Sequence, residues 1–394
     1  MKKFFVPGAL ILCIAVSVVM WILKPIPHGH RYDLAFQLSL VLALVWLLCK
    51  VPLEWISKRG LLLAVLVVGL GWGAFNIIGI DPQSEIVGAY RSVFEAVDSG
   101  KNPYTCGTIF HRGEDGNPVY GNFNYPPAEI YPYYLAYKIF GRWDSAVLTG
   151  VMLFLNGLCC LILLMMFKTV RAGCLAAFFP LFLAGEIKTN PSLTFLVTAL
   201  LLWLMVKDWR KPAGGRFFLI AVLFGIGLTT KFLIMPLMAA YYWHTFNPWK
   251  PRSLVRIAGG GAIALGTAAL IMAPFGVGAV LKNTILFNLV LKDRAVLTTF
   301  YPNVLSGPLN WAGLGAIYPL AALAVVGLAV LAAPRLSLFP AMLTASFAFL
   351  LAAPTPEPQY LPIVLFMALA SRCLEMEERG PCLLRLRKPV RPPG

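Results

Sequence analysis

The sequence predicts an all-α polytopic membrane protein with about 12 transmembrane helices. Three observations support this fold class: 59% of the 394 residues are hydrophobic, only 13% are charged, and the mean hydropathy is +0.76. Soluble domains carry charge on roughly a quarter of their residues. We therefore expect a single integral membrane domain over residues 1–394.

Twelve apolar runs are the candidate spans, since a bilayer core needs about twenty helical residues. They lie at residues 4–23, 34–53, 61–80, 146–167, 173–186, 191–206, 217–230, 232–246, 257–275, 309–333, 337–353 and 359–373. The runs near 173, 217 and 232 are short, which favours kinked, re-entrant or internally buried helices there. The first run follows Lys2 and Lys3 without a small-residue cleavage pattern, so we expect it to be retained as a span.

The distribution of Lys and Arg indicates the orientation, because short cytoplasmic loops are enriched in these residues. In this topology the cytoplasmic segments hold 21 of the 33 basic and 5 of the 17 acidic residues, so the whole net charge of +16 faces the cytoplasm. Both termini are then cytoplasmic, with a basic tail at 374–394. Basic residues scattered over short loops favour anionic lipid and argue against a nucleic-acid partner. The predicted location is the bacterial inner membrane.

A polar outward loop at residues 81–145 is the predicted catalytic region. It carries seven carboxylates between Asp81 and Glu129. Residues 83–98 show helical spacing of apolar side chains (Ile86, Tyr90, Phe94 and Val97), so we expect an interfacial helix that Asp81 caps. A carboxylate at the boundary of water and membrane is well placed to accept a proton from a bound hydroxyl. Asp81 is therefore the candidate general base.

Other connections on the outer side also carry polar residues. Lys231 lies inside a long apolar stretch, where a charge is costly unless an anion or a water-filled cavity receives it. Further polar groups on this side are Glu186, Lys188, Lys292, Arg294, Glu357, Gln359 and Tyr360. Other interpretations stay open: lysines at a membrane edge can extend to lipid headgroups, Glu357 can belong to a rigid solvated turn, and the tyrosines at 131–137 can form an interfacial aromatic belt.

The sequence gives no sign of a disulfide or a metal centre. Of the eight cysteines, only Cys106 falls on the outer side, so we expect no intramolecular disulfide. The histidines and cysteines lack the spacing of metal ligands, and we expect neither a divalent metal nor another cofactor.

The loop residues resemble the C-type glycosyltransferase superfamily, integral membrane enzymes that take a sugar from a polyprenyl-phosphate carrier, and within it glycosyltransferase family 87. The matching pattern is an Asp after an early span (Asp81), a Tyr nine residues on (Tyr90), then Gly100-x-Asn102-Pro103-Tyr104 and Tyr125-Pro126-Pro127 entering the next span. This pattern covers about fifty residues. Elsewhere the similarity is limited to the topology and to the loops at 188–191 and 357–360.

The resemblance implies an inverting transfer of a hexose, most often mannose, from the polyprenyl-phosphate donor to a glycan or glycolipid acceptor on the outer face. It implies that Asp81 is the general base. Cations stabilise charge that develops on a departing phosphate, which makes Lys231, Lys188, Lys292 and Arg294 candidates for binding the donor phosphate. The candidates for contacting the sugar or the acceptor are Glu85, Tyr90, Asn102, Tyr104, Tyr125, Glu186, Glu357, Gln359 and Tyr360. We expect a monomer surrounded by membrane lipids.

A flippase for a lipid-linked sugar or for the carrier lipid is the main alternative. Transporters often show repeated halves with broken helices near the bilayer midplane, whereas the polar residues here gather at one face and no internal repeat is evident. An oligosaccharide polymerase or ligase is expected to have a large late outer loop, and the large loop here comes early. A purely structural protein would not need so many outward carboxylates.

Overall fold

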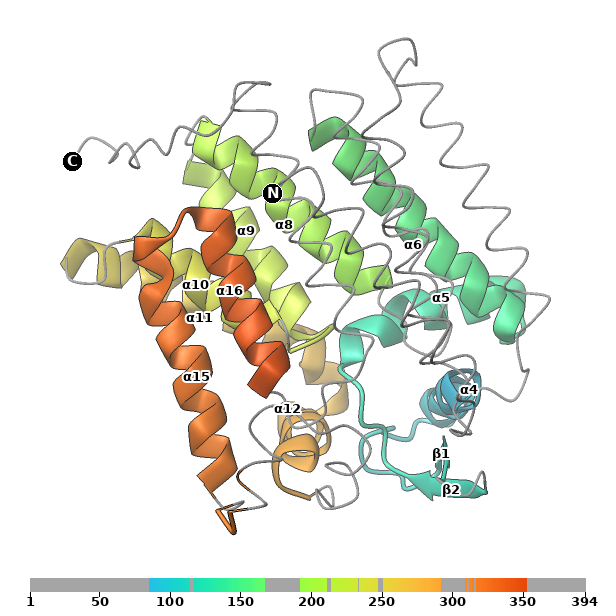
Figure 1. The fold of residues 1–394 in the computed structure, drawn as a ribbon. Helices are drawn as coiled ribbons and strands as arrows, with labels where there is room; N and C mark the ends of the chain where they lie inside the picture. Colours follow the sequence, from blue (N-terminus) through green and yellow to red (C-terminus); the bar gives the residue numbers. More distant parts are fainter. Residues whose placement is uncertain are drawn as a thin grey trace, which may run out of the picture.

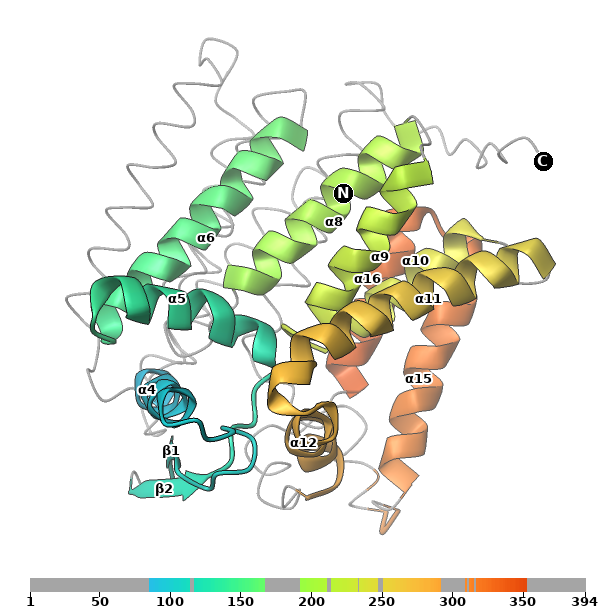
Figure 2. The same cartoon turned by 180° about the vertical axis from the view of Figure 1, so that it is seen from behind.

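The computed structural model describes residues 85–113, 117–166, 192–210, 214–232, 234–246, 251–291, 309, 312–314 and 317–352. Within these ranges the chain is mostly helical, with ten α-helices and one two-stranded sheet (Figures 1 and 2). The helical stretches Ser145–Leu163 and Pro251–Phe275 are long and apolar enough to cross a membrane, by length and composition. The predicted helical character is confirmed to this extent.

The helices that follow the loop begin and end close to the apolar runs of the sequence. They are α6 (Ser145–Met166), α8 (Ser192–Arg210), α9 (Gly214–Leu228), α10 (Ile234–Thr245), α11 (Pro251–Met272), α12 (Val277–Leu281), the π-helix η3 (Lys282–Leu291), α15 (Tyr318–Ala332) and α16 (Leu338–Ala352). The 3-10 turns η2 (Ala273–Phe275) and η5 (Ala333–Arg335) follow α11 and α15.

The two largest differences from the predicted runs are at the starts of α11 and α15. Helix α11 begins at Pro251 rather than at 257, because proline in the first turn loses no backbone hydrogen bond. In the run predicted at 309–333, α15 begins only at Tyr318, and Gly313 ahead of it has a φ of 71°, a left-handed conformation that interrupts a helix. The spans predicted at 4–23, 34–53, 61–80, 173–186 and 359–373, and the basic tail, lie outside the described residues.

The outward loop contains α4 (Glu85–Asp98), the 3-10 turn η1 (Pro127–Glu129) and α5 (Ile130–Phe140). Helix α4 confirms the helix predicted from the apolar spacing. Ile86, Tyr90 and Phe94 are buried on its inner face, and Val97 packs against the same core.

A β-hairpin in this loop departs from the all-α prediction. Strand β1 (Ile109–Arg112) pairs antiparallel with β2 (Pro118–Gly121), with Ile109 opposite Gly121. Ile109 is fully buried, and the Phe110 and Tyr120 rings meet edge to face across the strands, with centroids 6.2 Å apart. The sequence analysis missed the hairpin because four-residue strands give too short an alternation to recognise.

Helices α6, α8, α9, α10, α11, α15 and α16 form what we call the helical layer. The loop lies at one end of this layer (Figures 1 and 2). Helix α6 packs along α8, α9 packs against both α8 and α11, and α10 packs against α15 and α16. Helix α5 lies across the ends of these helices, with α4 and the hairpin beyond it. Two hydrophobic cores result, one inside the helical layer and one between α4, β1, α5 and the start of α6.

Two contacts define the chain directions. The Ala128 amide donates to the Thr229 carbonyl at 3.0 Å, which places the end of α9 at the loop, and the short connection 211–213 makes α8 antiparallel to α9. The Arg91 guanidinium donates to the Trp143 carbonyl at 2.9 Å, which places the start of α6 at the loop as well. Helices α6 and α8 are therefore parallel, as the predicted alternation of spans requires.

Glycine permits the closest helix approaches. A Cβ at Gly225 of α9 would lie 2.4 Å from the Ala264 carbonyl oxygen of α11, and one at Gly260 would lie 2.6 Å from the Tyr242 ring of α10. Small residues at such crossings let helices pack tightly, which matters most where the surrounding solvent is itself apolar.

Helices α6 and α8 bury polar side chains that make no hydrogen bond within the described residues. They are Asn156, Ser192, Thr194 and Thr198, all fully buried. We expect Thr198→Val to raise the free energy of unfolding by about 1 kcal/mol, because it removes a buried hydroxyl that has no partner among the described residues, at nearly constant shape. Thermal unfolding of the purified protein in detergent measures this change.

The matched control for this prediction is Thr149→Val, since the Thr149 hydroxyl donates to the Ser145 carbonyl at 2.8 Å. It should give no gain in stability. A loss of stability in Thr198→Val would mean that bound water satisfies the hydroxyl, contrary to the prediction.

Candidate functional site

Helix α4 presents Tyr90 to the centre of the loop core. Its side chain is 1% exposed, and its ring meets that of Tyr133 edge to face at 4.9 Å between centroids. Its hydroxyl donates to Glu129 Oε2 at 2.9 Å. The indole of Trp143 donates to the Val87 carbonyl at 3.1 Å and so holds α4 at the start of α6. Tyr90 is thus a core residue with one polar function, the hydrogen bond to Glu129.

Glu129 ends η1, and only 1% of it is exposed. Its position follows from the backbone: Pro126 is extended, Pro127 opens the turn, and the Ala128 amide is bonded to Thr229. While Oε2 accepts from Tyr90, Oε1 lies 3.9 Å from the Lys231 ammonium. A buried carboxylate costs several kcal/mol unless it is paired and hydrogen-bonded, and the Tyr90 hydroxyl and the Lys231 ammonium both favour its burial.

Lys231 occupies the break between α9 and α10 and is 5% exposed. The hydroxyls of Thr229 and Thr230 donate back to the Ile226 and Gly227 carbonyls at 2.7 Å, which satisfies the end of α9. The ammonium lies 5.5 Å from the centre of the Tyr125 ring, within reach of a cation–π interaction. Of the two environments expected for Lys231, an anion or a water-filled cavity, Glu129 of the loop provides an anion.

We call Tyr90, Tyr125, Glu129 and Lys231 the Glu129 cluster. Its members come from α4, from the segment before η1, from η1 itself and from the α9–α10 break. Three of these residues were predicted site residues. Glu129 was not, although it makes the contacts that join them.

Asn102 and Tyr104 of the sequence motif form a turn that connects the loop to the end of α11. The Asn102 amide nitrogen donates to the Phe275 carbonyl at 2.6 Å, and its oxygen accepts from the Tyr104 amide at 2.9 Å. The Tyr104 hydroxyl donates to the Tyr125 carbonyl at 2.7 Å, and Tyr104 is fully buried. The polar groups of both side chains thus have protein partners.

Asn283 connects the same turn to the π-helix η3. Its amide nitrogen donates to the Tyr104 carbonyl at 2.7 Å, and its oxygen accepts from the Asn122 amide at 3.3 Å. Asn122 in turn accepts from the Gly107 amide at 2.9 Å. These bonds hold the loop against the segment that follows α11.

Glu129 also shapes the electrostatics of the neighbouring phenols. The pKa values of Tyr90, Tyr104 and Tyr133 are raised well above their ordinary range, first by burial and then by the charge of Glu129. These phenols therefore remain protonated at neutral pH, and Tyr90 remains a hydrogen-bond donor to the carboxylate.

A second carboxylate, Asp98, joins the end of α4 to α5. It accepts from the Tyr134 hydroxyl at 2.5 Å, the Tyr137 hydroxyl at 3.3 Å and the Lys138 ammonium at 2.6 Å. The hydrogen bonds from Lys138 and Tyr134 lower the pKa of Asp98.

The aromatic-belt interpretation is wrong for Tyr133, which is fully buried in the loop core.

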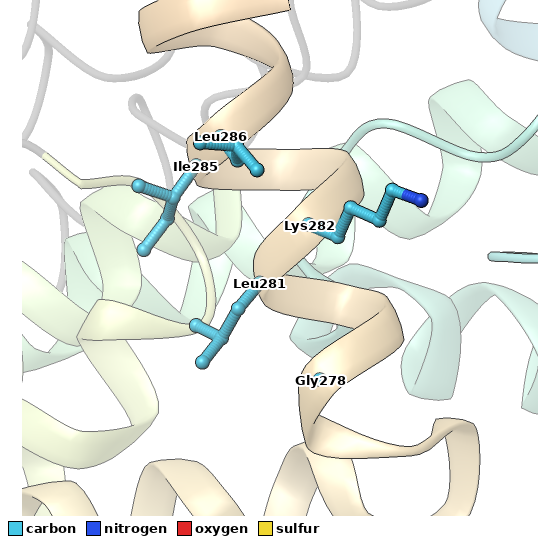
Figure 3. Close-up of a pocket in the computed structure, with 5 residues that line it drawn as sticks. All are labelled: Gly278, Leu281, Lys282, Ile285 and Leu286. Atoms are coloured by element: carbon cyan, nitrogen blue, oxygen red, sulfur yellow. The ribbon is translucent and has the colours of Figure 1, made fainter.

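A hollow of about 450 Å³ lies beside α12 and η3 (Figure 3). Its lining consists of Gly278, Leu281, Lys282, Ile285 and Leu286. The side chains of Leu281 and Ile285 extend to one side of the helix, and that of Lys282 extends to the other. None of the predicted site residues within the described ranges lines it, so we do not assign it as the site.

The remaining predicted site residues are not placed. Asp81, Glu186, Lys188, Lys292, Arg294, Glu357, Gln359 and Tyr360 lie outside the described residues. Glu85 is the first residue of α4, and its side chain is not described. The roles assigned to all of them remain predictions.

Among the described residues, no three His, Cys, Asp or Glu side chains lie together as metal ligands would. No protein-family model, curated protein or solved structure matches the chain.

The sequence did contain a signal for Glu129. It is the only Asp, Glu, Lys or Arg between Asp115 and Lys138, and Lys231 is the only one between Arg216 and Lys250. Two isolated opposite charges in apolar surroundings are expected to pair. The large separation in sequence and the crowd of tyrosines around Glu129 concealed the pair.

The contacts of Asp98 with Tyr134, Tyr137 and Lys138, which we call the Asp98 clamp, should make a pH-dependent contribution to stability. Because the folded-state pKa of Asp98 lies below its ordinary value of 3.8, this contribution is present above that value and lost as the pH falls through the lowered pKa. The pKa of Lys138 is raised, so the stability that its positive charge contributes to the ion pair with Asp98 is lost only at alkaline pH. Wild type should therefore unfold at a higher temperature than Asp98→Asn at neutral pH, and the difference should vanish in acid.

Thermal unfolding of the two proteins at a series of pH values tests this prediction. Glu95→Gln, which alters an exposed carboxylate on the same helix, is the control and should match wild type throughout. A difference between wild type and Asp98→Asn that persists at acid pH would contradict a charge-based clamp.

Proposed function

We propose that the protein is an inverting glycosyltransferase that moves a hexose from a polyprenyl-phosphate donor to a glycan or glycolipid acceptor at the outer membrane face. The observation that carries the proposal is the convergence of the motif residues Tyr90, Asn102, Tyr104 and Tyr125 in one packed loop at one end of the helical layer. A loop fixed in this way keeps α4, whose first residue follows Asp81 by four positions in the sequence, in one place relative to the helices.

We place the helical layer in the bilayer as about twelve spans with both termini cytoplasmic. Large apolar side chains on the described helices face outward: Leu320, Leu323 and Leu328 of α15 are 70%, 68% and 66% exposed. Val255 and Leu270 of α11 are similarly exposed. Soluble proteins rarely expose extended apolar surface, which supports a lipid environment for these faces.

The loop side of the layer is then the outer face. Helix α5 supports an interfacial position, because Tyr131, Leu135 and Ile139 recur at helical spacing on its exposed side. The opposite side of α5 packs on the loop core through Ile130 and Tyr133.

In the proposed reaction the Asp81 carboxylate accepts the proton of an acceptor hydroxyl as that oxygen attacks the anomeric carbon. The bond from the anomeric carbon to the phosphate oxygen breaks, its electron pair leaves with the polyprenyl phosphate, and the configuration inverts. Cations stabilise the charge on this leaving group, so the carrier does not require protonation.

Lys188, Lys292 and Arg294 are the proposed partners of the departing phosphate. Lys231 is the weaker candidate, because its ammonium is buried beside Glu129. Glu186, Glu357, Gln359 and Tyr360 are proposed to contact the hexose or the acceptor, together with the partly buried Tyr125. Tyr90, Asn102 and Tyr104 act instead as framework residues.

The test is the transfer of radiolabelled hexose from polyprenyl phosphate-mannose by protein purified into liposomes, with native lipids and glycans as the acceptor pool. Wild type should form a labelled product, and Asp81→Asn should slow turnover by about 10² to 10⁴-fold, as loss of a general base does. Glu95→Gln is the matched control and should retain turnover.

Two results would contradict the proposal. Near-normal transfer by Asp81→Asn would rule out its role as the base. Labelled donor that crosses the bilayer unchanged, with or without Asp81, would identify a flippase.

The proposed mechanism also predicts metal independence, because a monophosphate leaving group can be stabilised by lysine and arginine alone. Transfer should persist when EDTA is present in the same liposome assay. Loss of transfer that magnesium or manganese restores would contradict this prediction.

A further inference from the structure

The buried Glu129–Lys231 pair joins two parts of the chain that otherwise have separate cores. Glu129 belongs to the loop core and Lys231 to the break between two helices of the layer. The adjacent bond from the Ala128 amide to the Thr229 carbonyl links the same two segments at 3.0 Å. We call the Glu129–Lys231 pair and the Ala128–Thr229 bond the joint between loop and layer. Burying two opposite charges costs solvation free energy, so apolar residues would connect the two parts with less cost.

The pair is also connected to α4. The Tyr90 hydroxyl donates to the second oxygen of Glu129 at 2.9 Å, from the helix face that also buries Ile86 and Phe94. Asp81 precedes the first residue of α4 by four positions in the sequence. A displacement of Glu129 is therefore expected to move α4 through the hydrogen bond from Tyr90.

We propose that Glu129 is a positioning residue, which through Lys231 and Tyr90 holds α4, the helix that follows Asp81 in the sequence, in register with the helical layer. This inference rests on the proposed function for its kinetic consequence. It assigns Lys231 to the same joint, in place of the role in donor-phosphate binding predicted from the sequence.

Burial and charge favour this assignment for Lys231. The side chains of Lys231 and Glu129 are 6% and 1% exposed, which leaves little access for a lipid phosphate. The carboxylate already neutralises the ammonium, so the pair presents no net positive charge to an anion. The Tyr125 ring covers another side of the ammonium at 5.5 Å.

The test is a double-mutant cycle with Glu129→Gln, Lys231→Met and the double variant in the liposome transfer assay. Each single variant should lower kcat by about 10- to 100-fold through misalignment, with the donor KM within about twofold of wild type. The double variant should be no slower than the slower single variant, because both changes disrupt the same joint. Glu95→Gln is again the matched control.

Three kinetic results would overturn the proposal. A raised donor KM in Lys231→Met, with kcat unchanged, would assign Lys231 to the donor phosphate. Additive losses in the double variant would mean that the two residues act independently. Wild-type turnover in Glu129→Gln would remove its positioning role.

Tyr90→Phe gives a milder variant in case Glu129→Gln does not fold. It removes only the hydroxyl that bonds Glu129, and it should lower kcat while leaving the donor KM unchanged. A changed KM in Tyr90→Phe would instead indicate direct sugar contact and would overturn the positioning role of the hydrogen bond.

Stability separates failure of this inference from failure of the proposed function. Each single variant leaves one buried charge without its partner, so each should unfold at a lower temperature than wild type, and the double variant should recover part of the loss. Amide hydrogen exchange in α4 should be faster in each single variant. These results are expected even if wild type transfers no sugar, whereas normal stability and exchange in both single variants would overturn the joint itself.

Discussion

The fixed position of the loop depends on one electrostatic constraint, the burial of Glu129 against Lys231. Neither charge can be buried alone, so each segment requires the other in place. The Tyr90 hydroxyl of α4 donates to the Glu129 carboxylate. The Tyr125 ring, from the motif segment before η1, lies beside the Lys231 ammonium. Other contacts between loop and layer include neutral hydrogen bonds of smaller individual effect, such as Asn102 to Phe275, and the packing of the Tyr104 ring on Phe275.

This constraint explains how a loop with its own core can keep one position against the helical layer. The aromatic core around Tyr90, Phe94 and Trp143 makes the loop rigid, but apolar packing is not directional and does not by itself define a register with the helices. Hydrogen bonds are directional. The structure uses both at the boundary of loop and layer, where the Tyr104 ring packs on Phe275 and the Asn102 side chain donates to the Phe275 carbonyl.

Much of the helical framework could be predicted, because long apolar runs and the spacing of Ile86, Tyr90 and Phe94 are local signals. The hairpin at 109–121 could not, since each strand is only four residues long. Among the predicted site residues, Tyr90, Tyr125 and Lys231 lie together around Glu129. The sequence analysis assigned Asn102 and Tyr104 to ligand contact, whereas the structure uses their polar groups for internal hydrogen bonds.

Glu129 shows where prediction from sequence reached its limit. The choice between a free cation and a paired one at Lys231 depends on a partner about a hundred residues away, and no local pattern encodes that distance. Burial distinguishes the two cases, because a paired charge can be enclosed and a ligand-binding charge must remain accessible.

An experimental structure of the protein in a lipid nanodisc with bound polyprenyl-phosphate hexose would test most directly where the donor binds and whether Lys231 contacts it. We predict that the hexose lies at the loop end of the helical layer beside Asp81, and that Lys231 is still paired with Glu129. A donor bound within the layer between the helices, far from Asp81, or a Lys231 ammonium that has left Glu129 to contact the donor phosphate, would contradict it.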